Sequence, residues 1–160
     1  MIFRMQHAAG APAGEARNVR VIADYPAHVW LSPFSLRELM LALRAMARVL
    51  AQGSPAIPLS VDAHLVDDAS IYSANRQFMG CTGPTNVLSF PGGDGMRGSL
   101  LLSLDTLWRE CLLYGQTPEV YMLWLLAHGM GHLAGFDHGA AMDSACEACF
   151  AAARSALALR

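Results

Sequence analysis

Three of the six histidines lie close together in the sequence, at His128, His132 and His138. Residues four apart lie on one face of a helix, so the first two imidazoles would stand side by side. Gly135 can adopt the left-handed conformation that ends a helix, and the chain reversal would bring back the third imidazole. Three neutral imidazoles suit zinc and leave a fourth coordination position open, as in catalytic sites. The spacing therefore predicts one zinc ion per chain, held by the three histidines.

Other interpretations of these histidines remain open. They could be unrelated, with some of them stabilising a helix C-terminus as cations, or they could form a structural zinc site with a cysteine as fourth ligand. The spacing also matches the long zinc-protease pattern, but Gly129 stands where the proteases carry their general-base glutamate. Peptide hydrolysis by the usual route is therefore disfavoured. Asp137 is a candidate for orienting a ligand imidazole or acting as a base near the metal, and it could equally cap the turn.

Two sequence blocks resemble the YbeY family, the bacterial rRNA maturation factors and metal-dependent, single-strand-specific endoribonucleases. The segment AHGMGHLAGFDHG at 127–139 is similar to the family's histidine motif, including the glycine after the first histidine, and PTNVLSFP at 84–91 matches a second block. Asn75 and Gly80 match positions just upstream, and GSLLLS at 98–103 resembles a further region. The resemblance runs in order over roughly residues 18–159.

The resemblance implies a zinc site set against a small sheet, where metal-activated water attacks RNA phosphodiesters. It implies a cytoplasmic role in 16S rRNA 3′-end maturation and ribosome quality control. The partners would be rRNA or other single-stranded RNA, the small ribosomal subunit and its assembly proteins. We expect no membrane partner and no DNA substrate. Asn86 and Ser89, in the second block, are candidates for hydrogen bonds to the substrate, although turn chemistry and strand-edge hydrogen bonding would explain them too.

Three positions depart from the family pattern. Met79 stands where the family usually has an arginine, which we suppose holds phosphate or stabilises developing charge. Arg76 and Arg97 are candidates to supply that charge from another direction. Ser99 replaces an aspartate, and Gly131 replaces a leucine. Gly129 and Gly131 together cost about 2 kcal/mol of helix propensity relative to alanine, so packing must hold this helix.

The composition limits the class of protein. With 160 residues, 54% of them hydrophobic and 15% charged, the chain is long enough for one hydrophobic core and is not intrinsically disordered. No apolar run approaches the about 20 residues of a transmembrane helix, and the first residues lack the features of a secretory signal. The net charge is −2 and the chain has no lysine, so strong non-specific binding to nucleic acid is not implied. The cysteines are expected to be reduced, with Cys146 and Cys149 packed on one face of a helix.

The strands and helices predicted from the sequence indicate an α+β fold. We expect a small mixed four-stranded sheet with helices packed on it, and the zinc site at the end of a central helix. Residues 1–17 are expected to form a flexible tail, and residues 18–160 a single domain. Strands are predicted at 18–24, 59–66, 87–90 and 99–103, the last two in a hairpin-like or adjacent arrangement, with His64 half-buried in the second. Helices are predicted at 35–50, 67–79, 104–114, 118–134 and 141–159.

The leading hypothesis is a zinc-dependent endoribonuclease that acts in rRNA processing. Met79 and the low basicity motivate an alternative, a ribosome-assembly factor that retains the zinc site with weak or no catalysis. A third possibility is a metallohydrolase of a different, smaller substrate.

Overall fold

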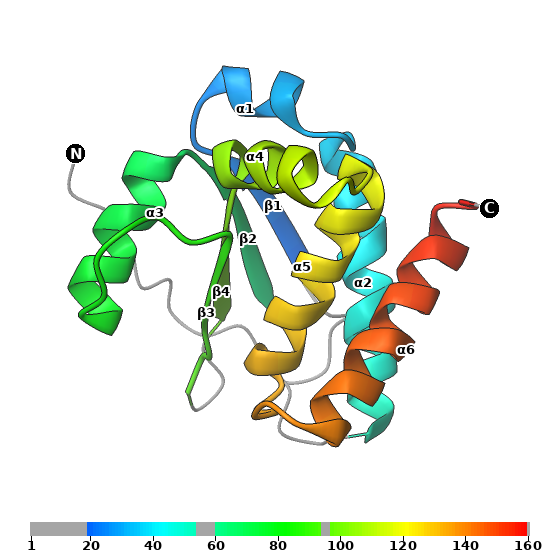
Figure 1. Ribbon diagram of the computed structural model, residues 1–160. Coiled ribbons are helices and arrows are strands. Elements are labelled where there is room, and N and C mark those ends of the chain that lie inside the picture. The colour runs from blue at the N-terminus through cyan, green and yellow to red at the C-terminus, as the bar shows by residue number, and fades with distance from the viewer. Residues whose placement is uncertain (1–18, 54–59, 94–96, 160) are drawn as a thin grey trace.

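Four strands form one mixed sheet at the centre of the molecule (Figure 1). The computed structural model describes residues 19–53, 60–93 and 97–159. The strands are β1 (Val19–Ala23), β2 (Val61–Val66), β3 (Val87–Phe90) and β4 (Gly98–Ser103), in the order β1-β2-β4-β3. β1, β2 and β4 run parallel, and β3 lies antiparallel to β4 at the edge. The predicted mixed four-stranded sheet is confirmed, whereas the predicted tail at 1–17 lies outside the described residues.

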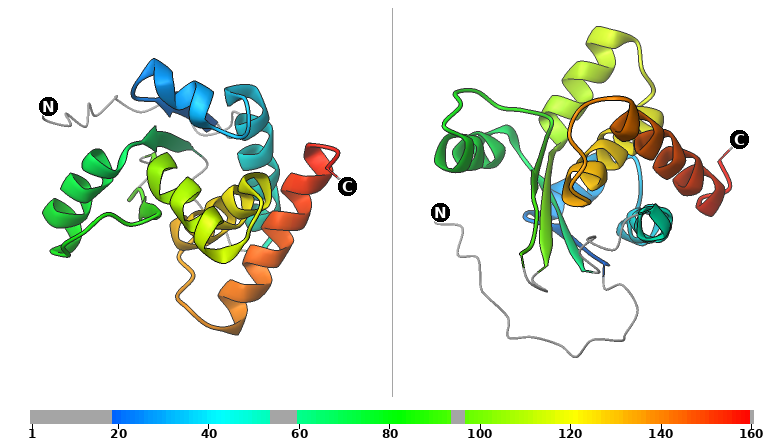
Figure 2. Two further views of the ribbon diagram at one scale, coloured as in Figure 1. Left: turned by 45° about the horizontal axis from the view of Figure 1, so that its top comes forward. Right: turned by 90° about the horizontal axis from the view of Figure 1, so that it is seen from below.

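The described residues form six α-helices and one π-helical turn. They are α1 (Pro26–Leu31), α2 (Leu36–Gly53), α3 (Asp68–Ala74), η1 (Asn75–Met79), α4 (Leu104–Tyr114), α5 (Pro118–Leu133) and α6 (Ala140–Ala156). The helices α2, α5 and α6 lie on one side of the sheet, and α3 lies on the other (Figure 2). The main core between the sheet and the three helices includes the fully buried Leu43, Leu100 and Leu123, and a smaller cluster with Val66 and Ile71 lies under α3. None of the helices in these ranges is both long and apolar enough to cross a membrane.

The start of α2 follows from a capping box. The Ser35 hydroxyl accepts a hydrogen bond from the Glu38 amide at 3.2 Å, and the Glu38 carboxylate accepts one from the Ser35 amide at 2.8 Å. The predicted start of this helix at Ser35 is therefore confirmed. The helix continues beyond its predicted end at Leu50 because Ala51 still packs against the core.

The short helix α1 has no counterpart among the predicted elements. Six residues make fewer than two turns, which is too short for a helical period to show in the sequence. Contacts with distant parts of the chain hold it. The His28 Nδ1 atom lies 2.9 Å from the Leu65 carbonyl oxygen, and the Trp108 indole donates to the Leu31 carbonyl at 2.8 Å. The predicted helix at 67–79 also differs, since it is divided between α3 and the wider turn η1.

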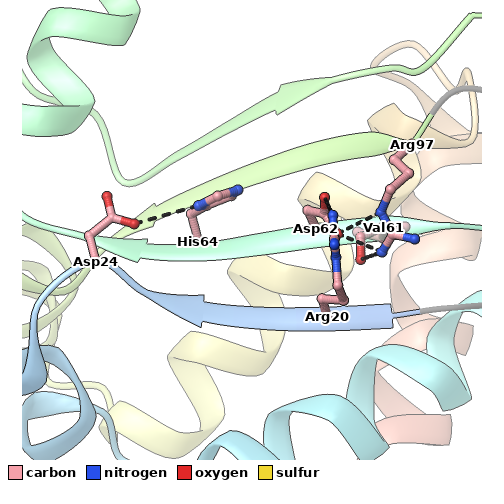
Figure 3. Close-up of polar contacts among 6 residues, drawn as sticks. All are labelled: Arg20, Asp24, Val61, Asp62, His64 and Arg97. Carbon is pink, nitrogen blue, oxygen red and sulfur yellow. Dashed lines mark hydrogen bonds and ion pairs between the residues drawn. The ribbon is translucent and has the colours of Figure 1, made fainter. Parts of the chain in front are cut away.

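A charged cluster lies on the sheet face opposite the main core (Figure 3). Asp62 of β2 accepts hydrogen bonds from the Nε atoms of Arg20 at 2.8 Å and Arg97 at 2.7 Å, and Arg97 also donates to the Val61 carbonyl at 3.1 Å. Burial raises the pKa of Asp62, but the hydrogen bonds from the two guanidiniums outweigh it and lower the pKa to about 2. The cluster therefore ties β1, β2 and the segment before β4 together. His64, on the same face, is half-buried as predicted.

The four cysteines fall into two environments. Cys81 is exposed, whereas Cys111, Cys146 and Cys149 are buried, the last two on α6 as predicted for the C-x-x-C pair. Burial raises the pKa of the Cys149 thiol to about 12 and also raises the pKa of Cys111 and Cys146. A raised pKa keeps a thiol protonated and inert, which agrees with a packing role for this pair.

Candidate metal centre

The end of α5 and the turn that follows it bring the three histidines together. Beyond the helix, Gly135 adopts a left-handed φ of +86°. The Phe136 amide then donates to the Gly131 carbonyl at 3.1 Å, so the chain turns back across the helix end. This reversal returns His138 to the two histidines of the last helical turns, as the spacing predicts.

The imidazoles are spaced for a shared metal ion. One ligand nitrogen from each of His128, His132 and His138 lies within 4.8 Å of the other two. The Nε2 atoms of His128 and His132 are 3.1 Å apart. Two zinc–nitrogen bonds of about 2.0–2.1 Å at the tetrahedral angle would separate their nitrogens by about 3.3 Å. The first two histidines are half-buried and His138 is exposed, so the site opens to solvent on one side.

The protonation states also fit a metal. The His132 Nδ1 atom lies 3.0 Å from the Phe136 carbonyl oxygen, which can only accept a hydrogen bond. Nδ1 must therefore carry the proton, and the lone pair is left on Nε2, the atom that approaches His128. Burial lowers the pKa of His128, and the neighbouring His132 and His138 lower it further. A lowered pKa favours the neutral imidazole, and metal binding requires neutral imidazoles. The donor set of this chain therefore suits zinc.

Close packing explains why a glycine follows the first histidine. A Cβ atom at Gly129 would lie 2.5 Å from Leu100 Cδ1 on β4 and 3.2 Å from the Ser89 hydroxyl. The Ser89 hydroxyl donates to the Gly129 carbonyl at 3.0 Å, which joins α5 to β3. Because position 129 faces the sheet, a glutamate there would collide with the core. The chain therefore has no room for the general base of the zinc proteases.

A cavity of about 570 Å³ lies beside the histidines. Its wall is formed by Met79, residues 85–89, Pro91, the three histidines and residues 135–137. The cavity thus runs along the edge strand β3 and ends at η1. Within the described part of the chain, no arginine lines it. Met79, which is exposed, occupies the wall at the position where the family pattern has its arginine.

The structure brings some of the predicted site residues to this cavity. Asp137 lines it and is exposed. Asn86 and Ser89 also line it, but their side chains are engaged within the protein. The Asn86 amide donates to Glu110 at 3.1 Å and its oxygen accepts from the Val87 amide at 2.8 Å. Hydrogen bonding within the fold therefore accounts for both side chains.

The two candidate arginines lie elsewhere. Arg97 is bound to Asp62 in the charged cluster on the sheet, and Arg76 is exposed on η1. Neither side chain forms part of the cavity wall. Two contributors to the site were absent from the predicted set, Thr85 on the wall and the Phe136 carbonyl that orients His132. Thr85 belongs to the PTNVLSFP block and could have been included, whereas a backbone carbonyl leaves no signal in the sequence.

Comparisons with known proteins settle the family. A family model described as Endoribonuclease YbeY matches residues 34–153. The Endoribonuclease YbeY of Nitratidesulfovibrio vulgaris is 40% identical over 164 residues, which cover 88% of this chain and 97% of the relative. That of Lawsonia intracellularis is 42% identical over 120 residues, covering 74% of this chain and 86% of the relative. The chain belongs to the YbeY family.

The fold of this YbeY-family chain is also found in a solved structure. The solution structure of TM1509 from Thermotoga maritima aligns with a TM-score of 0.59 at 19% sequence identity, covering 88% of this chain and 91% of that chain. The resemblance predicted from the two sequence blocks is confirmed, and so is the α+β fold with the histidine cluster at the end of α5.

Proposed function

We propose that this YbeY-family chain is a zinc-dependent endoribonuclease. The observation that carries the proposal is the cluster of His128, His132 and His138, with the His132 tautomer set by a backbone carbonyl, in the wall of a cavity along an edge strand. The relatives that are 40% and 42% identical are both named Endoribonuclease YbeY, which supports RNA as the substrate and phosphodiester hydrolysis as the reaction.

The three histidines would hold zinc, and bound zinc would supply a Lewis acid and an activated water for attack on a phosphodiester. The residues of the chain have separate tasks. The Phe136 carbonyl keeps the His132 lone pair directed at the cluster. Gly129 lets α5 approach the sheet, so that the cluster lies against β3. The Asp137 carboxylate, exposed in the cavity wall, is placed to accept a proton from a substrate or water in the cavity.

We further propose that the chain acts in the cytoplasm on the 3′ end of 16S rRNA and in ribosome quality control. Its partners would be the small ribosomal subunit and the assembly proteins of that subunit. Residues 18–160 would form one YbeY-like domain. The absence of arginine from the described cavity wall fits a protein that relies on the ribosome to present its substrate. Strong binding to RNA alone would need a basic surface.

Metal analysis combined with RNA cleavage tests this function. The purified protein should contain about one zinc per chain and cleave a labelled single-stranded RNA, and a chelator should abolish the cleavage. His132→Ala should lose both stoichiometric zinc and cleavage, because only two imidazoles remain. Full zinc content in His132→Ala would refute the ligand assignment, and cleavage that survives verified zinc removal would refute the zinc dependence.

Met79 favours one alternative, an assembly factor with weak or no catalysis. A thioether in the cavity wall can neither donate a hydrogen bond nor offset charge on a phosphate. A protein that sediments with small ribosomal subunits but cleaves no RNA, with zinc bound, would fit this alternative. A protein that does neither would fit a metallohydrolase of a smaller substrate.

A further inference from the structure

The outer side of strand β3 faces the cavity. The Ser103 amide of β4 donates to the Asn86 carbonyl at 2.9 Å, just before β3 begins. In an antiparallel pair, residues whose backbone N–H and C=O groups point at the partner strand alternate with residues whose groups point away. Asn86 and Leu88 therefore face β4, whereas the backbone groups of Val87 and Ser89 point away from it. Because β3 is the edge strand and lines the cavity, these groups point toward the cavity.

Of the outward positions on this edge, Ser89 is the one that offers an amide. The Val87 amide is capped by the Asn86 side-chain oxygen at 2.8 Å, and Pro91 has no N–H. Within the described residues, no hydrogen bond is formed from the Ser89 amide. The Ser89 hydroxyl is bound to the Gly129 carbonyl, one residue from the ligand His128, so the amide is fixed beside the metal centre.

We propose that the Ser89 backbone N–H donates a hydrogen bond to a non-bridging oxygen of the RNA phosphodiester bound in the cavity. The inference rests on the proposed endoribonuclease function and adds a catalytic donor to it. The phosphoryl oxygens gain charge as the reaction proceeds, and a donor that the fold holds in place stabilises that charge. The described cavity wall has no arginine, and the Thr85 hydroxyl is a second candidate donor on it. A strand amide is the more rigid of these two donors.

Solution NMR of the zinc-loaded protein tests the contact directly. The ¹⁵N-labelled chain is titrated to saturation with a single-stranded oligouridylate at low temperature, which slows cleavage. The Ser89 amide proton should move downfield as it gains a phosphate acceptor. The amides of Leu88 and Phe90 are bonded to β4 and serve as internal controls that should move little. If RNA binding perturbs the cavity residues but leaves the Ser89 amide proton in place, the proposal is overturned.

Two variants at the same position separate the amide from the side chain. Ser89→Ala removes the hydroxyl and keeps the N–H, whereas Ser89→Pro removes both. Proline is tolerated on an edge strand where the N–H points outward. The kcat/KM for RNA cleavage should be lower in Ser89→Pro than in Ser89→Ala by a factor on the order of 10²–10³, with equal zinc content in both variants. Equal kcat/KM values would overturn the proposal, as would a loss of that size in Thr85→Val with Ser89→Pro unaffected.

The same experiments separate this proposal from the function on which it rests. If the unsubstituted protein neither binds nor cleaves single-stranded RNA, the proposed function fails and the role of the Ser89 amide fails with it. If the unsubstituted protein binds and cleaves RNA while Ser89→Pro matches Ser89→Ala, the function stands and the amide contact alone is rejected.

Discussion

Replacing Gly129 with alanine should destabilise the protein although it improves helix propensity. The added Cβ atom would lie 2.5 Å from Leu100 Cδ1 and 3.2 Å from Leu100 Cγ. Leu100 is fully buried in the sheet, so it has no room to withdraw. Either α5 must move away from β4 or the leucine must leave its rotamer, and overpacking of this kind costs about 1–3 kcal/mol. The propensity gain of about 1 kcal/mol offsets only part of that cost.

Gly131→Ala is the matched control, two residues further along the same helix. Its Cβ atom would lie 2.5 Å from Met142 Sδ and 2.8 Å from Met142 Cε. These atoms are the far end of an unbranched side chain that can adopt other rotamers, so the clash is relieved more easily. The propensity gain is the same at both positions. We therefore expect Gly129→Ala to be about 1–2 kcal/mol less stable than Gly131→Ala.

Thermal unfolding followed by circular dichroism measures this difference. For a domain of this size the expected gap in melting temperature is about 2–8 °C, with Gly129→Ala the lower of the two. The zinc content of each variant should be recorded, because Gly129 adjoins the ligand His128. If Gly129→Ala melts at or above the temperature of Gly131→Ala, the reasoning that the sheet requires a glycine at this position is wrong.

Three further predictions follow from the same structure. Chelation should lower the melting temperature by several degrees, because the metal ties the end of α5 to the turn at His138 and stabilises only the folded state; an unchanged melting curve after verified metal removal would contradict this. Met79→Arg should increase cleavage of single-stranded RNA, by up to the order of 10²–10³, with unchanged zinc content, because a guanidinium can stabilise charge on the phosphate; no gain would show that the site needs no cation there. Asp62 has a folded-state pKa of about 2, below its ordinary 3.8, so it contributes stability above about pH 4 that is lost as the pH falls toward 2. That contribution to the free energy of unfolding is on the order of 2 kcal/mol. Asp62→Asn should lose it at neutral pH, and the stability of the variant should depend less on pH in the acid range. An unchanged acid-unfolding profile would refute the lowered pKa of Asp62.

The parts of the fold that local sequence signals determine could be predicted. Helix α4 begins and ends where expected, because Ser103 caps its first turn and Gly115 adopts the left-handed conformation after its last residue. Strand β3 and its antiparallel partner follow from two short apolar runs with a turn between them. Helix α1 could not be predicted, since it is held by the distant Leu65 and Trp108 rather than by its own sequence.

The candidate site likewise has parts that the sequence predicts and parts that depend on contacts between distant segments. The histidine cluster depends on helix periodicity and one glycine turn, both of which lie within eleven residues of sequence, so its geometry could be predicted. The ion pair of Arg97 with Asp62 could not be predicted, because it depends on the pairing of β2 with β4. That pairing brings the Asp62 carboxylate to 2.7 Å from the Arg97 Nε atom. The need for Gly129 likewise appears only when α5 packs on Leu100.

The distribution of the cysteines makes the protein convenient to label. Cys111, Cys146 and Cys149 are buried, and burial holds their thiols in the unreactive protonated form at neutral pH. Cys81 is exposed, two residues from Met79 on the rim of the cavity, and its Sγ atom lies 3.6 Å from the Met79 carbonyl oxygen. A maleimide fluorophore should therefore attach at one position without any cysteine being removed. Its emission would report the arrival of an RNA chain at the mouth of the cavity in real time.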